Sequence, residues 1–236
     1  MKGEPVLSLI LPCRNQGDYI GTLLPKYLPP LERTRIPFEL IVVPNACTDA
    51  TVQVVARLAQ HDERIRMIEL AEGGWGRAVR AGLRAAWGSV LAYTNSARTD
   101  PEVLPAFLEC FLRNREALVK AQREARQAPL REIGSAIFNF EARICFGIRC
   151  RDVNGTPKIF SRKLYESLAL SSTGDLFDLE LIVAADKQGV PIVENPVRGF
   201  HRHGGKSSTT LSSAWKMYAG ALRLWRKMRS QAAIRP

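Results

Sequence analysis

Two hydroxyls and one amide follow a short apolar segment near the middle of the chain. The segment is Val90–Tyr93, and Thr94-Asn95-Ser96 comes directly after it. Carboxylates in such a place would bind Mg²⁺ or Mn²⁺, whereas neutral hydroxyls are poor ligands for these cations. The triplet therefore offers a ligand hydrogen bonds and no charge.

Polar residues also follow two other apolar segments, at Pro12-Cys13-Arg14-Asn15 and Pro44-Asn45-Ala46-Cys47. Ligands bind beyond the carboxyl ends of the strands in open parallel sheets, so we expect the three stretches to form one site. The amide of Asn45 both donates and accepts hydrogen bonds, which suits the edge of a nucleobase. The alternative is a turn that caps the next helix, although Thr48 and Asp49 are better placed for capping.

Apolar runs and turn residues alternate through the first half of the chain. We expect strands at residues 6–11, 38–43, 65–70, 90–93 and 117–121, and helices at 50–60, 77–87 and 102–115. This alternation predicts an α/β fold with a mostly parallel sheet covered by helices on both faces. Further on we expect helices at 132–146 and 176–187, a strand at 190–197 and a helical tail at 211–228.

The composition is that of a folded globular protein with a large basic surplus. The 236 residues are 46% hydrophobic and carry a net charge of +11. That surplus favours an anionic partner, such as nucleotide phosphates, nucleic acid or a membrane face. Five scattered cysteines without a CxxC pair indicate a reducing compartment. The first residues predict a strand rather than a signal peptide, and no run of 18 apolar residues occurs.

Four stretches, in order, resemble the motifs of family 2 glycosyltransferases. They are LSLILPCRNQ, IVVPNACTDAT, the stretch from GGWGRAV to TNSARTDP, and PVRGFHRHGGKSS. The last is similar to the ending of the polyprenyl-phosphate, dolichol-phosphate mannosyltransferase-like branch. The resemblance implies a glycosyltransferase A-type fold, a UDP- or GDP-linked sugar donor, inversion at the anomeric carbon, and a lipid-linked acceptor such as a polyprenyl phosphate. It implies no organic cofactor.

The resemblance also assigns donor-binding residues, which are Pro12, Arg14, Gln16, Asn45, Gly76, Thr94, Asn95 and Ser96. Arg14 stands where the family has a tyrosine, and its guanidinium can stack on a base or bind a phosphate; the alternative is a solvated loop arginine. Gly73, Gly74 and Gly76 precede the helix expected at residues 77–87, and glycines there can let backbone N–H groups approach a phosphate. The alternative there is a plain strand-to-helix turn.

Two aspartates that bind the metal in the family are replaced here by Thr94 and Ser96, and Asp100 is placed to cap a helix. Three explanations stay open. The diphosphate oxygens hold a metal with few protein ligands, arginines and lysines replace the metal, or the protein is inactive. Catalysis with little or no metal ranks first, and we assign no metal ligand.

The resemblance places the acceptor site in the second half of the chain. Its acceptor-binding residues are Arg131, Ser135, Lys158 and Ser207, and its catalytic residues are Asp178, Glu180 and Arg202. Arg131 and Ser135 share a helical face that suits an anion, or form an ordinary polar face. A phosphate acceptor is already ionised at pH 7 and needs no base, whereas a sugar hydroxyl needs one.

We expect a single domain over residues 1–208, with a nucleotide-sugar half at 1–121 and an acceptor half at 122–208, and a basic amphipathic helix at 209–236. The tail has an apolar stripe that either lies on an anionic membrane or packs on the domain; its residues are Trp215, Tyr218, Leu222, Trp225 and Met228.

The sequence therefore predicts a glycosyltransferase bound peripherally to the cytoplasmic face of a membrane. The alternative is a non-catalytic member that binds nucleotide-sugars or a protein partner. Nucleic acid is not an expected partner, because no nucleic-acid-binding motif is visible.

Overall fold

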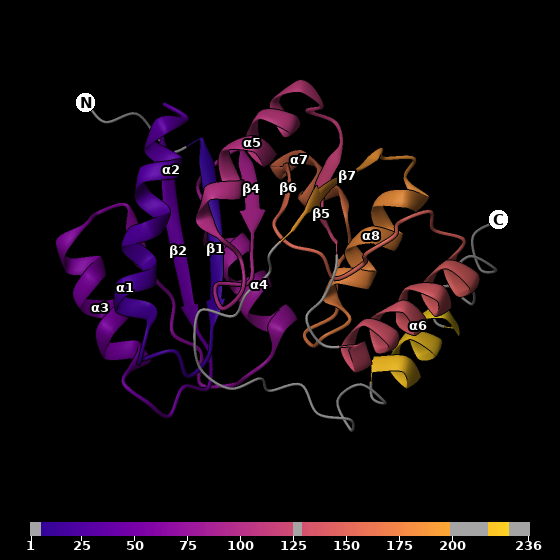
Figure 1. Ribbon diagram of the computed structural model, residues 1–236, viewed down its shortest axis with the longest axis horizontal. Coiled ribbons are helices and arrows are strands. Elements are labelled where there is room, and N and C mark those ends of the chain that lie inside the picture. The colour runs from indigo at the N-terminus through magenta and orange to yellow at the C-terminus, as the bar shows by residue number, and fades with distance from the viewer. Residues whose placement is uncertain (1–5, 125–128, 199–216, 227–236) are drawn as a thin grey trace.

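The computed structural model describes residues 6–124, 129–198 and 217–226, and for residues 129–133 it describes the helix only. Its centre is a seven-stranded sheet in the order β3-β2-β1-β4-β6-β5-β7 (Figure 1). The strands are β1 (Leu7–Cys13), β2 (Phe38–Pro44), β3 (Ile65–Met67), β4 (Val90–Tyr93), β5 (Leu118–Arg123), β6 (Lys158–Ser161) and β7 (Ile192–Val197).

The sheet is mostly parallel, as the sequence predicted. Strand β1 pairs in parallel with β2 and β4, β2 with β3, and β5 with β7. Only β6, among the strands described, runs against its neighbours β4 and β5. All seven residues of β1 are buried, which explains its continuous apolar sequence.

Helices cover both faces of the sheet. They are α1 (Ile20–Leu23), α2 (Leu28–Arg33), α3 (Thr51–His61), α4 (Trp75–Ala85), α5 (Leu104–Arg113), α6 (Pro129–Phe146), α7 (Arg162–Ser167) and α8 (Phe177–Lys187), with 3₁₀ turns at Leu24–Tyr27 and Pro101–Val103. One apolar cluster joins the sheet to α1, α2, α3 and α5, and a second joins it to α4, α6 and α8. Gly82 lets α4 lie close to β1, since a Cβ there would be 2.5 Å from Ile10 Cγ2.

Element boundaries differ from the predicted ones by a few residues. Strand β3 ends at Met67 rather than at residue 70, and Leu70 forms only an isolated bridge with Asn45. Helix α4 begins at Trp75, two residues early, and α6 begins at Pro129, three residues early. Apolar patterns define a buried face well and helix ends poorly.

A helix over residues 217–226 lies beside α6, where Figure 1 colours it yellow. Tyr218 donates a hydrogen bond to the carbonyl of Gly134 at 2.7 Å, and its ring lies 6.1 Å from that of Phe138. Ala221 is fully buried, whereas Leu222 is 43% exposed. The buried face of this helix is therefore offset from the predicted stripe, of which Trp215 and Met228 lie outside the described residues.

Candidate active site

The carboxyl ends of β1 and β2 meet at Asn45, whose side chain joins three segments. Its Nδ2 donates to the carbonyl of Cys13 at 2.8 Å, and its Oδ1 accepts from the backbone N–H of Gly74 at 3.2 Å. The amide is 5% exposed. Asn45 thus links two strand ends to the glycine-rich turn. Asp49 Oδ1 accepts from the N–H of Thr51, the first residue of α3, at 3.0 Å, although the N-cap position itself is Ala50.

Three of the predicted donor-binding residues come together at this edge. Ser96 Oγ lies 3.0 Å from both the carbonyl oxygen of Pro12 and Oε1 of Gln16, and can donate to either. The backbone N–H of Gln16 donates to Thr51 Oγ1 at 2.7 Å, which fixes the loop after β1 on α3. The strand ends of β1 and β4 are therefore joined through Ser96.

The hydroxyls of Thr94 and Ser96, which the resemblance places at metal-ligand positions, both form hydrogen bonds inside the protein. Thr94 and Ser96 are fully buried. Thr94 Oγ1 donates to Thr99 Oγ1 at 2.6 Å, and Ser96 Oγ donates to Pro12 or Gln16. Both hydroxyls are neutral and buried, so this pair does not fit a divalent cation, which prefers charged carboxylate ligands.

Nearby carboxylates are also engaged. Asp100 Oδ1 accepts from the N–H of Glu102 at 3.0 Å, which confirms its capping role. Burial opposes the charged form of Asp49, but hydrogen bonds from Thr51 and Gly17 outweigh it and lower the pKa of the carboxyl. Over the described ranges, no group of three or more His, Cys, Asp or Glu side chains could hold a metal. The residues present do not fit a carboxylate-held cation.

The glycine-rich turn packs the start of α4 against α8. A Cβ on Gly76 would lie 2.7 Å from Cβ of Phe177, so only glycine permits this approach. The N–H groups of Gly76 and Arg77 donate to the carbonyls of Gly174 and Thr173 at 3.2 and 2.7 Å. Both N–H groups therefore donate within the protein, as expected for an ordinary strand-to-helix turn, and neither is available to a phosphate.

Two further residues that were predicted to bind the sugar donor lie at the rim of this edge. Arg14 is exposed, and its guanidinium lies beside Gly73, where an added Cβ would be 3.2 Å from Nη1. Asn95 is half-buried, and its Oδ1 accepts from the N–H of Ala97 at 3.0 Å. Arg14 is therefore exposed at the rim of this edge, while Asn95 shapes the turn after β4.

Asp178, in the first turn of α8, is the centre of a buried cluster. Its Oδ1 accepts from Tyr93 Oη at 2.6 Å and from Lys158 Nζ, and its Oδ2 accepts from Trp75 Nε1 at 2.7 Å. The side chains of Lys158 and Asp178 are 0% and 5% exposed. Burial lowers the pKa of Lys158 even though Asp178 opposes the shift. One carboxylate thus joins the end of β4 to the starts of β6, α4 and α8.

Glu180 does not join Asp178. Its carboxylate accepts from the N–H and hydroxyl of Ser171 at 3.0 and 2.8 Å, and from the N–H of Ser172 at 2.7 Å. It therefore holds the loop before α8. The two acidic residues that the sequence grouped as catalytic belong to separate networks.

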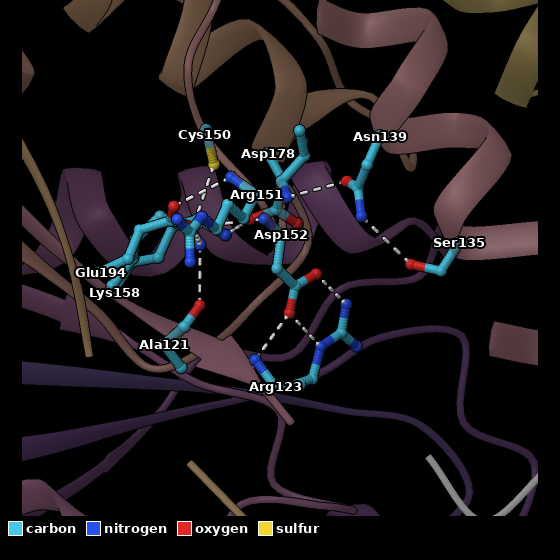
Figure 2. A network of polar contacts seen from close by, with 12 residues as sticks. Ala121, Arg123, Ser135, Asn139, Cys150, Arg151, Asp152, Lys158, Asp178 and Glu194 are labelled. Atoms are coloured by element: carbon cyan, nitrogen blue, oxygen red, sulfur yellow. Dashed lines mark hydrogen bonds and ion pairs between the residues drawn. The ribbon is translucent and has the colours of Figure 1, made fainter. Parts of the chain in front are cut away.

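A larger polar network joins β5, β6 and β7, and Figure 2 shows it around Asp152, Lys158 and Glu194. Arg123 donates to Asp152 through Nε at 2.7 Å and Nη2 at 2.6 Å. Lys120 Nζ pairs with Glu194 Oε1 at 2.9 Å, and Glu194 also accepts from the N–H of Arg151. Sequence reasoning missed Lys120 and Glu194, although a charge inside an apolar strand is a detectable signal.

Helix α6 contributes the polar face that the sequence predicted. Asn139 Oδ1 accepts from the N–H of Val153 at 3.0 Å, and its Nδ2 lies 3.5 Å from Ser135 Oγ (Figure 2). The side chain of Arg131, and Arg202 and Ser207 altogether, lie outside the described residues.

The fold and the edge of polar strand ends define a glycosyltransferase of the A-type architecture. The chain belongs to glycosyl transferase family 2, whose family model matches residues 8–169. Its fold is similar to glucosyl-3-phosphoglycerate synthase from Mycobacterium tuberculosis in complex with Mn²⁺, UDP-glucose and phosphoglyceric acid, at a TM-score of 0.73 and 19% identity over 94% of this chain and 80% of that one.

Curated relatives are longer than this chain. Glycosyltransferase AglD of Haloferax volcanii is 29% identical over 81% of the chain and 32% of its own length. The low-salt glycan biosynthesis hexosyltransferase Agl6 of the same organism is 24% identical over 90% and 52%. The dodecaprenyl-phosphate galacturonate synthase of Rhizobium johnstonii is 26% identical over 70% and 50%. The chain spans from about a third to about half of these relatives.

Proposed function

We propose that this chain transfers a sugar from a UDP- or GDP-linked donor to a polyprenyl phosphate, with inversion. The donor site is the carboxyl edge of β1, β2 and β4, where Pro12, Gln16 and Ser96 meet. Exposed Arg14 at the rim can bind the base or a phosphate of the nucleotide. Membership of family 2 and the general place of ligand sites in such sheets support this assignment.

The hydrogen bonds of Asp178 favour a phosphate rather than a hydroxyl as the acceptor. A hydroxyl acceptor must lose its proton to a base, and the base needs a free lone pair within reach. Both oxygens of Asp178 already accept hydrogen bonds, from three donors in all, one of which is the buried amine of Lys158. Glu180 is similarly occupied. A phosphate acceptor is ionised at pH 7 and requires no such base, and the dodecaprenyl-phosphate relative points to the same class.

We further propose that no carboxylate-held metal assists the donor. Solved structures of similar fold bind Mn²⁺ or Mg²⁺ with UDP, but here Thr94 and Ser96 are buried and bonded to protein. Basic side chains can stabilise a diphosphate leaving group in place of the metal. The same missing aspartates favour a second candidate, a non-catalytic nucleotide-sugar-binding member.

The proposed site of action is the cytoplasmic face of a membrane, with the protein bound peripherally. The +11 net charge suits an anionic surface, and the apolar tail of a polyprenyl phosphate holds that acceptor in a bilayer. Within the described residues, no helix is long and apolar enough to cross a bilayer.

A transfer assay tests the function. The protein is mixed with a labelled UDP- or GDP-sugar and with polyprenyl phosphate or dephosphorylated polyprenol in detergent. We expect label in the organic phase with the phosphate and none with the alcohol. Transfer to the alcohol would contradict the proposed role of Asp178.

Nucleotide binding is measured in parallel by thermal unfolding, because a ligand of the folded state raises the midpoint. A higher midpoint without transfer to either acceptor would support the non-catalytic candidate. No response to any nucleotide would exclude both.

A further inference from the structure

One face of α6 carries large apolar side chains that point into solvent. Ile137, Phe140 and Ile144 are 53%, 61% and 68% exposed. Their spacing of three and four residues puts them on one side of the helix. Single exposed apolar residues are ordinary on protein surfaces, whereas a contiguous stripe indicates an interaction surface.

The opposite face of α6 is anchored to the rest of the protein. Phe138 and Ala142 are buried in the second apolar cluster, and Asn139 bonds to the N–H of Val153. Tyr218, on the helix over residues 217–226, bonds to the carbonyl of Gly134. Figure 1 shows the two helices side by side at one end of the molecule, so the apolar stripe is presented outward by a fixed helix.

Exposed arginines lie on α6, on the segment that follows it and on the neighbouring helix. Residues 134–151 and 217–226 contain five arginines and a single acidic residue, Glu141. The arginines are all exposed and are Arg143, Arg149, Arg151, Arg223 and Arg226. Glu141 is half-buried, and burial raises the pKa of its carboxyl, which favours its neutral form. The surface therefore has an apolar centre, a cationic margin and little opposing charge.

We propose that this surface, the α6 face with its arginine margin, docks on an anionic lipid bilayer. An amphipathic helix lies in the headgroup layer when apolar burial and attraction to anionic lipid act together. A second copy of the chain fits less well, because a twofold contact through this face would bring identical cationic margins together. This docking surface rests on the proposed function, in which the acceptor is lipid-linked. It lies on α6, whereas the sequence placed the membrane contact on the apolar stripe of the tail.

Docking in this manner also orients the acceptor half. Ser135 and Asn139, from the predicted acceptor region, lie on the inner side of α6 facing the polar network (Figure 2). Ile137, Phe140 and Ile144 face away from it. The bilayer would then lie within one helix diameter of the acceptor region, which is about 10 Å.

Co-sedimentation with vesicles tests the proposal. The intact chain should bind vesicles that contain phosphatidylglycerol, bind pure phosphatidylcholine weakly, and be released as salt rises. Phe140→Glu and Ile144→Glu should each lower the vesicle partition coefficient by about tenfold or more, because each removes apolar burial and adds repulsion. Trp87→Glu is the matched control, since Trp87 is 65% exposed at the end of the sheet away from α6 and its change should leave binding unaltered.

Two results would overturn the proposal. One is that the intact chain does not bind the vesicles, or that it binds them and the α6 variants bind them equally well. The other is a concentration-dependent dimer that Phe140→Glu abolishes, which would make the surface a contact between copies. Circular dichroism checks that each variant is folded, and stabilisation by UDP is measured on the same samples. Retained nucleotide binding without vesicle binding would refute the docking surface alone, whereas the reverse would refute the proposed function.

Discussion

Replacing Asp178 with alanine is expected to lower the free energy of unfolding by about 3–5 kcal/mol, because it leaves the buried amine of Lys158 without its ion-pair partner. The two side chains are 0% and 5% exposed, so solvent does not screen their interaction. The substitution also removes the acceptor of Trp75 Nε1 and Tyr93 Oη. Urea unfolding followed by circular dichroism measures the loss.

A double-mutant cycle separates the ion pair from the other contacts of Asp178. Lys158→Met alone should also destabilise, and the combination of Asp178→Ala with Lys158→Met should cost clearly less than the sum of the two single changes. The control is the exposed pair of Arg33 and Glu102, whose side chains are 55% and 61% exposed. Glu102→Ala should change stability by no more than about 1 kcal/mol. Additive losses at Asp178 and Lys158 would refute the coupling.

Replacing Asp152 with asparagine is expected to make the stability of the protein less sensitive to acid. Burial raises the pKa of Asp152, but its hydrogen bonds and ion pair with Arg123 outweigh burial and hold the pKa well below the ordinary value. A lowered pKa in the folded state stabilises the protein above the unfolded-state pKa, and that contribution is lost as pH falls toward the folded-state pKa. At pH 7 the substitution should cost about 1.5–3 kcal/mol.

The pH profile distinguishes this effect from simple loss of packing. Below about pH 4, the wild-type advantage over Asp152→Asn should shrink by about 1.4 kcal/mol per pH unit. Urea unfolding between neutral and acid pH gives the two curves. Glu109→Gln is the control, because Glu109 pairs with Arg113 on an exposed helix face. Parallel curves for wild type and Asp152→Asn would contradict the assignment.

The sequence predicts the sheet and its polar edge at the strand ends because both depend on local patterns. Continuous apolar runs define β1, β2 and β4, and their polar ends are adjacent in any parallel sheet. The capping role of Asp100 follows from its place before a proline-started helix. These features require no knowledge of which distant residues meet.

Long-range pairing is the part that the sequence does not reveal. Lys120 and Glu194 lie on β5 and β7, 74 residues apart, and only the strand order joins them. The separation of Asp178 from Glu180 depends on which side of α8 faces β4 and which faces the loop at Ser171. The exposed stripe of α6 likewise depends on which of its faces the core covers.

Titration calorimetry of UDP and GDP into EDTA-treated protein tests the central claim most directly. The claim is that the donor binds at the edge of Ser96 and Gln16 without a carboxylate-held metal. We predict that the Kd of the nucleotide that binds differs by no more than about threefold with and without Mn²⁺, which is a difference in binding free energy of less than about 1 kcal/mol. Ser96→Asp should weaken binding in EDTA, because it puts a carboxylate beside the diphosphate, and Mn²⁺ should restore it. Binding by the wild type that vanishes in EDTA and returns with Mn²⁺ would contradict the account.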